Sequence, residues 1–263
     1  MQHVAGHTNS YHTYSLDEAL AGIAEAGYGA VELTAVEGWT EHVDLDADTS
    51  ELRAKLAHHG LVPVVLSGHS DLTTPEGRDY GIKAIRWCHA YGIPVMNTAI
   101  GGHSSQEENE VAFLAHIGEL AVEADRCGID VALEIHGEIM ASGVKTLPLL
   151  ERIGHERIKV AYDTANCVFY GGVDAVDDLG TMLPYLANVH LKDDRGGKGI
   201  WDFPEPGAGD VDFGALIAQL AAAGYAGPLS VEIEFQGEPW PALAEVTAAM
   251  TRGYAHLTSL GLS

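Results

Sequence analysis

The segment ELAVEADRCGIDVALEIH, residues 119–136, passes from a helical pattern through a single glycine into a β-branched strand pattern. The glycine is Gly128, and the strand pattern covers residues 130–136. Glycine suits the left-handed position that follows the last turn of a helix, because it has no Cβ to clash there. The segment therefore predicts a helix that ends at Gly128 and leads directly into a strand.

The same order recurs along the whole chain. Glycines stand between a helical pattern and a strand pattern at Gly27, Gly60, Gly92, Gly128, Gly154 and Gly224. Helical patterns lie near residues 15–27, 48–60, 76–91, 107–127, 145–154, 174–184, 212–224 and 240–260, and the first begins with a capping box at Ser15 and Glu18. Strand patterns lie at 3–8, 30–36, 61–67, 94–100, 130–136, 158–163, 187–192 and 228–234. This alternation indicates βα units and a parallel sheet.

The number of units and the length of the chain select one α/β architecture. Eight units in 263 residues match a closed barrel better than an open doubly wound sheet. A glycine-rich phosphate fingerprint, typical of a Rossmann domain, is missing after the first strand pattern. We predict a single (β/α)₈ TIM barrel that forms one domain over residues 1–263.

Charge and cysteine content limit which binding partners and which cellular compartment we expect. The chain has 14 Lys and Arg against 38 Asp and Glu, a formal net charge of −24, which repels nucleic-acid backbones and anionic lipids. No apolar run is long enough for a membrane span, and the N-terminus lacks the pattern of a signal peptide. Cys88, Cys127 and Cys167 have no metal or disulfide spacing. We expect a cytoplasmic protein that binds neither nucleic acid nor membrane; a homo-oligomer remains open.

Polar residues gather where four successive strand patterns end. These residues are Glu134 and His136, Asp163 and Asn166, His190 and Lys192, and Glu232 and Glu234. Alternate residues of a barrel strand point inward, and an inward charge is costly unless it is paired or binds a metal. Glu134, Asp163, His190 and Glu232 would supply three carboxylates and one imidazole, a set that suits Mn²⁺ first, and also Mg²⁺ or Co²⁺. Internal ion pairs, such as Glu134 with Lys192, are the structural alternative.

Other side chains are candidates for contacts around that cluster. His69, His136, Lys192 and Arg195 are candidates for substrate contacts, and His7 and His12 are weaker ones. Lys192 has two interpretations, a proton donor or a counter-ion of the carboxylates. Trp39 and Trp201 lie in loops at the rim of the barrel. There they would either pack against a sugar ring or only provide hydrophobic cover. Glu32 fits a structural role best. Residues 193–211 form either an active-site lid or a plain surface loop.

The same segments resemble the sugar isomerase/epimerase superfamily with a xylose isomerase-like barrel. They are LEIH at 133–136, YDTAN at 162–166, VHLKD at 189–193 and VEIE at 231–234. This superfamily includes ketose 3-epimerases, hydroxypyruvate isomerases, inosose dehydratases and endonuclease IV. The resemblance covers the whole chain and implies metal ligands at Glu134, Asp163, His190 and Glu232.

The resemblance also implies roles beyond metal binding. Glu134 and Glu232 would additionally move protons on the two sides of the substrate, as in ketose epimerases. Substrate contacts would come from Asn166 and Arg195. Lys192 stands where ketose 3-epimerases tend to have a small residue, and this departure argues against a simple free-ketose epimerase.

Four functions are compatible with these patterns. The first is an isomerase or epimerase of a sugar or keto-sugar that uses one divalent metal ion, Mn²⁺ before Mg²⁺ or Co²⁺, and transfers a proton through an enediolate. The second is an inosose dehydratase-like lyase that eliminates water or a glycosyl group next to a ketone. The third is an endonuclease IV-like DNA repair enzyme, which the charge of −24 disfavours. The fourth is a sugar-binding barrel without chemistry. A recognisable phosphate cradle is missing, which favours a non-phosphorylated substrate.

Overall fold

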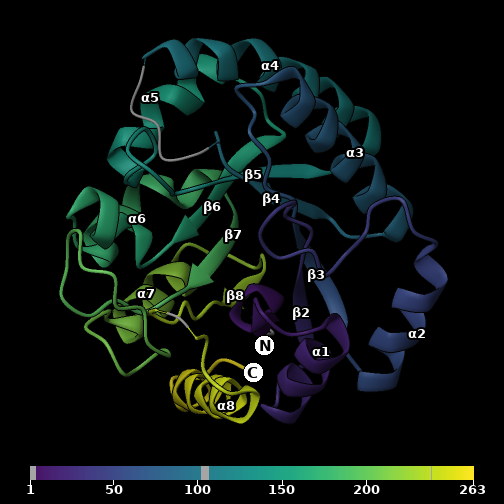
Figure 1. Ribbon diagram of the computed structural model, residues 1–263. Helices are drawn as coiled ribbons and strands as arrows, with labels where there is room; N and C mark the ends of the chain where they lie inside the picture. The colour runs from purple at the N-terminus through teal and green to yellow at the C-terminus, as the bar shows by residue number, and fades with distance from the viewer. Residues whose placement is uncertain (1–3, 102–106, 238) are drawn as a thin grey trace.

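The computed structural model of the chain describes residues 4–101, 107–237 and 239–263. Eight parallel strands close into a barrel in sequence order, each paired with its neighbours and β8 paired with β1 (Figure 1). The strands are β1 (Val4–His7), β2 (Ala30–Thr34), β3 (Val62–Ser67), β4 (Val95–Thr98), β5 (Asp130–Glu134), β6 (Ile158–Asp163), β7 (Leu186–Leu191) and β8 (Leu229–Val231). The predicted (β/α)₈ architecture is confirmed.

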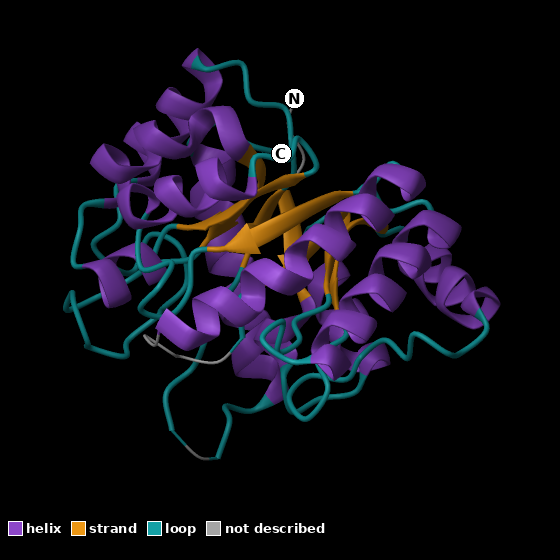
Figure 2. Cartoon of the chain, turned by 90° about the horizontal axis from the view of Figure 1, so that it is seen from above, coloured by secondary structure: helices purple, strands orange, loops and turns teal. Residues whose placement is uncertain are grey.

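Helices surround the strands on the outside of the barrel (Figures 1 and 2). They are α1 (Leu16–Glu25), α2 (Thr49–His59), α3 (Pro75–Tyr91), α4 (Glu107–Cys127), α5 (Gly143–Ile153), α6 (Ala175–Met182), α7 (Phe213–Ala222) and α8 (Leu243–Ser259). Three short turns, η1 (Thr8–Tyr11), η2 (Cys167–Gly171) and η3 (Leu183–Tyr185), interrupt the loops. The ends of the described chain meet, since the Val4 backbone N–H donates to the Ser263 carbonyl at 2.9 Å.

Local signals place the helix ends as predicted. All six glycines between helix and strand have a positive φ, from 61° at Gly154 to 104° at Gly27. The capping box is formed, because the Ser15 side chain accepts from the Glu18 N–H and the Glu18 carboxylate accepts from the Ser15 N–H.

Several predicted strands run too long at their carboxyl ends, whereas β3 and β6 end at Ser67 and Asp163 as predicted. β5 stops at Glu134 and β8 at Val231, so His136 and Glu232 lie beyond the last paired residue. The reason is that the chain leaves the ladder at the rim to enter the loops. At the other end of the chain, the predicted first strand begins at His3, which lies outside the described residues.

The interior of the barrel changes character along its axis. Small apolar side chains fill one layer, and they are Val65, Val95, Ala132, Ala161 and Ala187. Buried polar side chains fill the next layer toward the carboxyl ends of the strands, and they include Glu32, Ser67, Asn97, Asn188 and His190. The apolar layer closes the barrel floor, and the polar layer faces the end where barrel enzymes carry their sites.

Two further expectations concern cysteines and membranes. Cys88, Cys127 and Cys167 are buried free thiols, consistent with their lack of disulfide spacing. Across residues 4–101, 107–237 and 239–263, no helix is both long enough and apolar enough to cross a bilayer.

Two glycine substitutions test the origin of the helix ends. Gly60 ends α2 with φ 67°, whereas Gly118 lies within α4, and a Cβ on either would meet no described atom within 4 Å. Gly60→Ala should destabilise the fold by about 1 kcal/mol, because an L-residue is strained in the left-handed region. Gly118→Ala should stabilise it by about 0.5–1 kcal/mol, because alanine loses less backbone entropy in a helix. Urea unfolding measures both, and effects of the same sign would contradict the assignment.

Candidate metal centre

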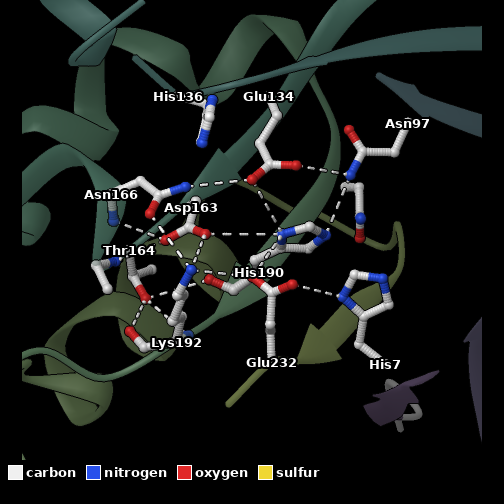
Figure 3. Close-up of polar contacts among 12 residues, drawn as sticks. His7, Asn97, Glu134, His136, Asp163, Thr164, Asn166, His190, Lys192 and Glu232 are labelled. Atoms are coloured by element: carbon white, nitrogen blue, oxygen red, sulfur yellow. Dashed lines mark hydrogen bonds and ion pairs between the residues drawn. The ribbon is translucent and has the colours of Figure 1, made fainter. Parts of the chain in front are cut away.

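Four neighbouring strands bring the predicted ligands together. Glu134 ends β5, Asp163 ends β6, His190 lies in β7, and Glu232 directly follows β8. One ligand atom from each of these four buried residues lies within 4.8 Å of all the others. Figure 3 shows their side chains turned toward one another. Since the strands are parallel and adjacent, their carboxyl ends meet at one rim.

The centre of this cluster contains polar atoms that lack a hydrogen bond. His190 Nδ1 lies 3.8 Å from Glu134 Oε1, from Asp163 Oδ2 and from Glu232 Oε2. His190 Nδ1 and Asp163 Oδ2 are both buried without a hydrogen-bond partner among the described residues. Buried polar atoms are normally satisfied, and coordination of an ion would satisfy both. Three carboxylates and one imidazole form a set that could hold a divalent metal ion.

The backbone after β6 orients Asp163. Its Oδ1 accepts hydrogen bonds from the backbone N–H groups of Ala165 at 2.9 Å and Asn166 at 2.8 Å. This local turn is characteristic of aspartate. It occupies one carboxylate oxygen and leaves Oδ2 directed at the cluster.

Glu32 orients His190 from below. Its Oε1 lies 3.2 Å from His190 Nε2 and accepts a hydrogen bond from Ser67 Oγ at 2.8 Å, and its Oε2 accepts from Asn188 Nδ2 at 3.0 Å. Burial alone raises the pKa of Glu32, but the nearby His190 and His7 outweigh it and hold that pKa well below its usual range. With Nε2 engaged by this carboxylate, the imidazole presents Nδ1 to the cluster. This geometry supports the structural role predicted for Glu32.

Glu134 is held by donors from three elements. Its Oε2 lies 3.0 Å from His69 Nε2 and accepts from Asn97 Nδ2 at 3.2 Å, and its Oε1 accepts from Asn166 Nδ2 at 3.2 Å. Burial raises the pKa of Glu134, but His190 and His69 outweigh it and lower the pKa to about 2. The carboxylate is therefore ionised at neutral pH.

Glu232 is held by a different set of groups. Its Oε1 accepts from Asn9 Nδ2 at 2.9 Å and lies 3.0 Å from His7 Nδ1, and its Oε2 lies 3.2 Å from Lys192 Nζ. Burial raises the pKa of Glu232, but Lys192 and His7 outweigh it and hold the pKa well below its usual range. This carboxylate is also ionised, next to a buried cation.

Lys192 pairs with the β8 side of the site. Its Nζ lies 2.6 Å from Glu234 Oε2 and 4.5 Å from the centre of the Phe203 ring. Burial lowers the pKa of Lys192, but Glu232 and Glu234 outweigh it and raise that pKa well above its usual range. The sequence suggested Glu134 as its structural partner. The ammonium instead joins Glu232 and Glu234, because it projects from β7 toward the neighbouring β8.

A cavity of about 330 Å³ opens above the cluster. The predicted contact residues His69, His136, Asn166 and Lys192 line it, together with Glu134 and Glu232. Its wall also includes Val36, Trp39, Tyr170, Trp201 and Phe203. The cavity thus has a charged floor and a largely aromatic mouth.

The loop after β7 forms part of the cavity wall, and hydrogen bonds within the loop hold it together. Asp193 is fully buried, and its carboxylate accepts from the backbone N–H groups of Asp194, Gly207, Gly209 and Val211. This anchoring presents Trp201 and Phe203 to the cavity. The loop at 193–211 therefore contributes to the candidate site and is more than a plain surface loop.

Arg195 is not brought to the other candidates. Its guanidinium pairs with Asp202 of the same loop at 2.8 Å and 3.2 Å, and its side chain is 56% exposed. The short loop ion pair turns the arginine toward solvent, whereas the cavity wall is formed by its neighbours in the loop. A substrate contact from Arg195 remains a prediction that this geometry does not support.

Sequence reasoning missed two asparagines of the site. Asn9 contacts Glu232, and Asn97 contacts Glu134, Ser67 and Glu32. Both lie outside the four strands that carry the predicted ligands, Asn9 in η1 and Asn97 in β4. Asn97 carried a usable signal, because it is an amide inside a mostly apolar strand pattern, PVMNTAI at 94–100.

Comparisons with known proteins agree with the observed fold. A family model described as xylose isomerase-like TIM barrel matches residues 20–254. An L-ribulose 3-epimerase of Methylomonas sp. (strain DH-1) is 28% identical over 233 residues, 82% of this chain and 77% of that protein. An inosose dehydratase of Geobacillus kaustophilus (strain HTA426) is 26% identical over 262 residues, 84% of this chain and 80% of that protein.

Solved structures show the same fold at low identity. A structure of L-ribulose 3-epimerase has a TM-score of 0.78 at 18% identity and covers 99% of this chain and 94% of that one. A xylose isomerase-like TIM barrel protein from Mycobacterium smegmatis, in complex with magnesium, has a TM-score of 0.75 at 14% identity and covers 99% of this chain and 98% of that one.

Metal addition tests the cluster directly. Mn²⁺ at about 100 times its dissociation constant should stabilise the native chain by about 2.7 kcal/mol, because the ion binds only the folded state. Asp163→Ala should remove this stabilisation, whereas Asp177→Ala, at an exposed position of α6, should keep it. Thermal unfolding of chelator-treated protein with and without Mn²⁺ is the measurement. Equal stabilisation of the two variants would rule out ligation by Asp163.

Proposed function

The chain belongs to the xylose isomerase-like TIM barrel family, and from its site we propose a divalent-metal-dependent epimerase or isomerase of a sugar or keto-sugar. One observation carries this proposal. Glu134 and Glu232 flank the cluster from β5 and β8, while Asp163 and His190 reach it from the two strands between. Two ionised carboxylates on either side of one bound carbon are the arrangement that proton removal and return require.

The named relatives support the same class of reaction. They include L-ribulose 3-epimerases and inosose dehydratases, and solved structures of the same fold include a D-allulose 3-epimerase in complex with D-allulose. Both named activities act on carbons next to a carbonyl. The chemistry proposed here is common to both: a proton leaves such a carbon.

The chain's own residues divide the work of proton transfer. A divalent ion held by the four ligands would supply Lewis acidity toward a substrate carbonyl and hydroxyl, which acidifies the C–H bond between them. One glutamate removes that proton. The other, after taking a proton from a substrate hydroxyl or water, delivers it to the opposite face and forms the epimer. Return of the proton to the adjacent carbon would instead give the aldose–ketose isomer.

The cavity selects for an uncharged substrate. Its buried ammonium, Lys192, is already paired with Glu232 and Glu234, and the floor carries the four ligand side chains. A phosphate or carboxylate group would face these carboxylates without a free cation among the described lining residues. We therefore expect non-phosphorylated sugars, with His69, His136 and Asn166 in contact with their hydroxyl groups.

Hydrogen exchange in D₂O tests the proposal. With Mn²⁺, the protein should incorporate solvent deuterium at one carbon of a ketose, and NMR identifies that carbon. L-Ribulose, D-allulose, D-tagatose and an inosose form the first screen. Protein that retains Mn²⁺ but exchanges and converts none of a broad set of keto-sugars would contradict the proposed function.

Substitutions that keep the side-chain shape but remove the charge test the two proton carriers. Glu134→Gln and Glu232→Gln should each lower turnover by about 10²- to 10⁴-fold, because an amide cannot accept the substrate proton. Glu151→Gln, at an exposed position of α5, provides the matched control and should leave turnover unchanged. Near-native turnover in either site variant would remove that glutamate from the proton path.

A second candidate is elimination of water next to a ketone. Lys192 favours it, because a buried ammonium lines the cavity and could donate a proton to a departing hydroxyl. Glu234, 2.6 Å away, would hold the ammonium in place.

One variant separates the two reactions. Dehydration creates a conjugated product with new ultraviolet absorbance, whereas epimerisation does not. If the chain is a dehydratase, Lys192→Met should reduce the absorbance change by about 10²-fold or more, while deuterium exchange into the substrate continues. Wild-type protein that exchanges deuterium without any absorbance change, on ketoses and inososes alike, would exclude elimination.

A further inference from the structure

Asn9 connects the cluster to the mouth of the cavity. It lies in η1, directly after β1, and is buried with 8% of its surface exposed. Its Nδ2 donates to Glu232 Oε1 at 2.9 Å, and its Oδ1 accepts from Trp39 Nε1 at 3.0 Å and from Thr40 Oγ1 at 2.8 Å. One amide therefore joins a carboxylate of the site to two residues of the loop after β2.

We propose that Asn9 is a positioning residue that sets Glu232 for proton transfer and links its position to the rim residue Trp39. This inference rests on the proposed function. It assigns Asn9 no contact with the reacting atoms, since the residue acts through the carboxylate.

Hydrogen-bond chemistry allows only one orientation of the amide. The indole Nε1–H can only donate, and an ionised carboxylate can only accept. The amide oxygen must therefore face Trp39, and the amide NH₂ must face Glu232. If the amide were flipped, its oxygen would face the Glu232 carboxylate and its NH₂ would face the indole N–H of Trp39. Both contacts would then be repulsive. Trp39 and Thr40 thus orient the donor that Glu232 receives.

The contact on one oxygen of Glu232 determines where the other points. With Oε1 held by Asn9 at 2.9 Å and close to His7 Nδ1 at 3.0 Å, Oε2 lies 3.8 Å from His190 Nδ1 and 3.2 Å from Lys192 Nζ, inside the cluster. Without the amide, the remaining close groups are His7 on one side and Lys192 on the other. The ammonium would then draw the carboxylate toward Glu234 and away from the substrate.

The rim end of the link is itself supported. His12 stacks on the Trp39 indole with ring centres 3.8 Å apart, and His12 Nδ1 lies 2.7 Å from Thr40 Oγ1. Trp39 is 50% exposed and lines the cavity. A substrate that packs against this indole therefore contacts the side chain that orients Asn9.

The hydrogen bonds of Asn9 connect Trp39 to Glu232 but not to Glu134. Glu134 takes its hydrogen bonds from Asn97 and Asn166 and has His69 at 3.0 Å, a set that does not include Asn9 or Trp39. Disturbing Asn9 should therefore impair the proton step of Glu232 and spare that of Glu134. This asymmetry distinguishes a positioning role from a general loss of structure.

Two variants and one control test the link. Trp39→Phe keeps a ring on His12 but removes the Nε1–H donor, and Asn9→Ala removes the amide. Trp201→Phe makes the same change at another aromatic residue that lines the cavity, on the loop after β7. Asn9→Ala should lower kcat about tenfold, or ~1.4 kcal/mol, and Trp39→Phe should lower it about threefold. Thermal unfolding identifies any variant that fails to fold.

The first decisive measurement does not depend on turnover. Glu232 is one of the four ligands, so Asn9→Ala should weaken Mn²⁺ binding to chelator-treated protein about tenfold, and Trp39→Phe should weaken it by a smaller factor in the same direction. Trp201→Phe should bind Mn²⁺ as the wild type does. Unchanged Mn²⁺ affinity in folded Asn9→Ala protein would overturn the proposal.

The second measurement compares the two glutamates in D₂O. Starting from the epimer whose proton Glu134 removes, slower delivery by Glu232 should raise the deuterium found in recovered substrate relative to that in product. Trp201→Phe can change KM but should leave this ratio as in the wild type. If Asn9→Ala and Trp39→Phe lower turnover but leave this deuterium ratio as in the wild type, the asymmetric link is wrong. If wild-type protein exchanges no sugar at all, the proposed function fails, while the Mn²⁺ titration still decides whether Asn9 holds Glu232.

Discussion

Mutual repulsion among buried carboxylates is the constraint on which the functional end of the barrel depends. Glu32, Glu134, Asp163 and Glu232 lie within one buried layer, with at most 5% of each residue exposed. Bringing such charges together in a low-dielectric interior is unfavourable unless cations or donors compensate them. The imidazole of His190 stands at their centre, 3.2 Å from Glu32 and 3.8 Å from the others. A divalent ion would provide the compensation that these groups leave incomplete.

The compensation is unequal on the two sides of the cluster. On the β5 side, neutral amides and an imidazole surround Glu134. On the β8 side, the ammonium of Lys192 lies between Glu232 and Glu234. The two glutamates are therefore not interchangeable, although the same residue type occupies both positions. A reaction that uses both would meet amides and an imidazole on one face of the substrate and an ammonium on the other.

Much of the fold could be predicted because its signals are local. Gly60 and Gly154 end helices through their own backbone preference, and Ser15 starts one through its own side chain. The four candidate ligand positions could also be predicted, since a charged or imidazole side chain inside an apolar strand pattern is conspicuous. Strand ends were less predictable: Glu232 continues the pattern of β8 but follows its last paired residue, and pairing depends on the neighbouring strand.

The eight βα units, the closed barrel and the four charged side chains at the strand ends could be predicted, because periodicity and strand order are properties of the chain. The partners of the polar side chains around the site could not, because they depend on the folded structure. Lys192 pairs across to Glu234, Arg195 pairs within its own loop, and Asn9 joins Glu232 to Trp39, which lie 223 and 30 residues away from it along the chain. Hydrogen bonds and ion pairs act over about 3 Å. Their choice among competing partners therefore depends on distances that exist only after the barrel has closed.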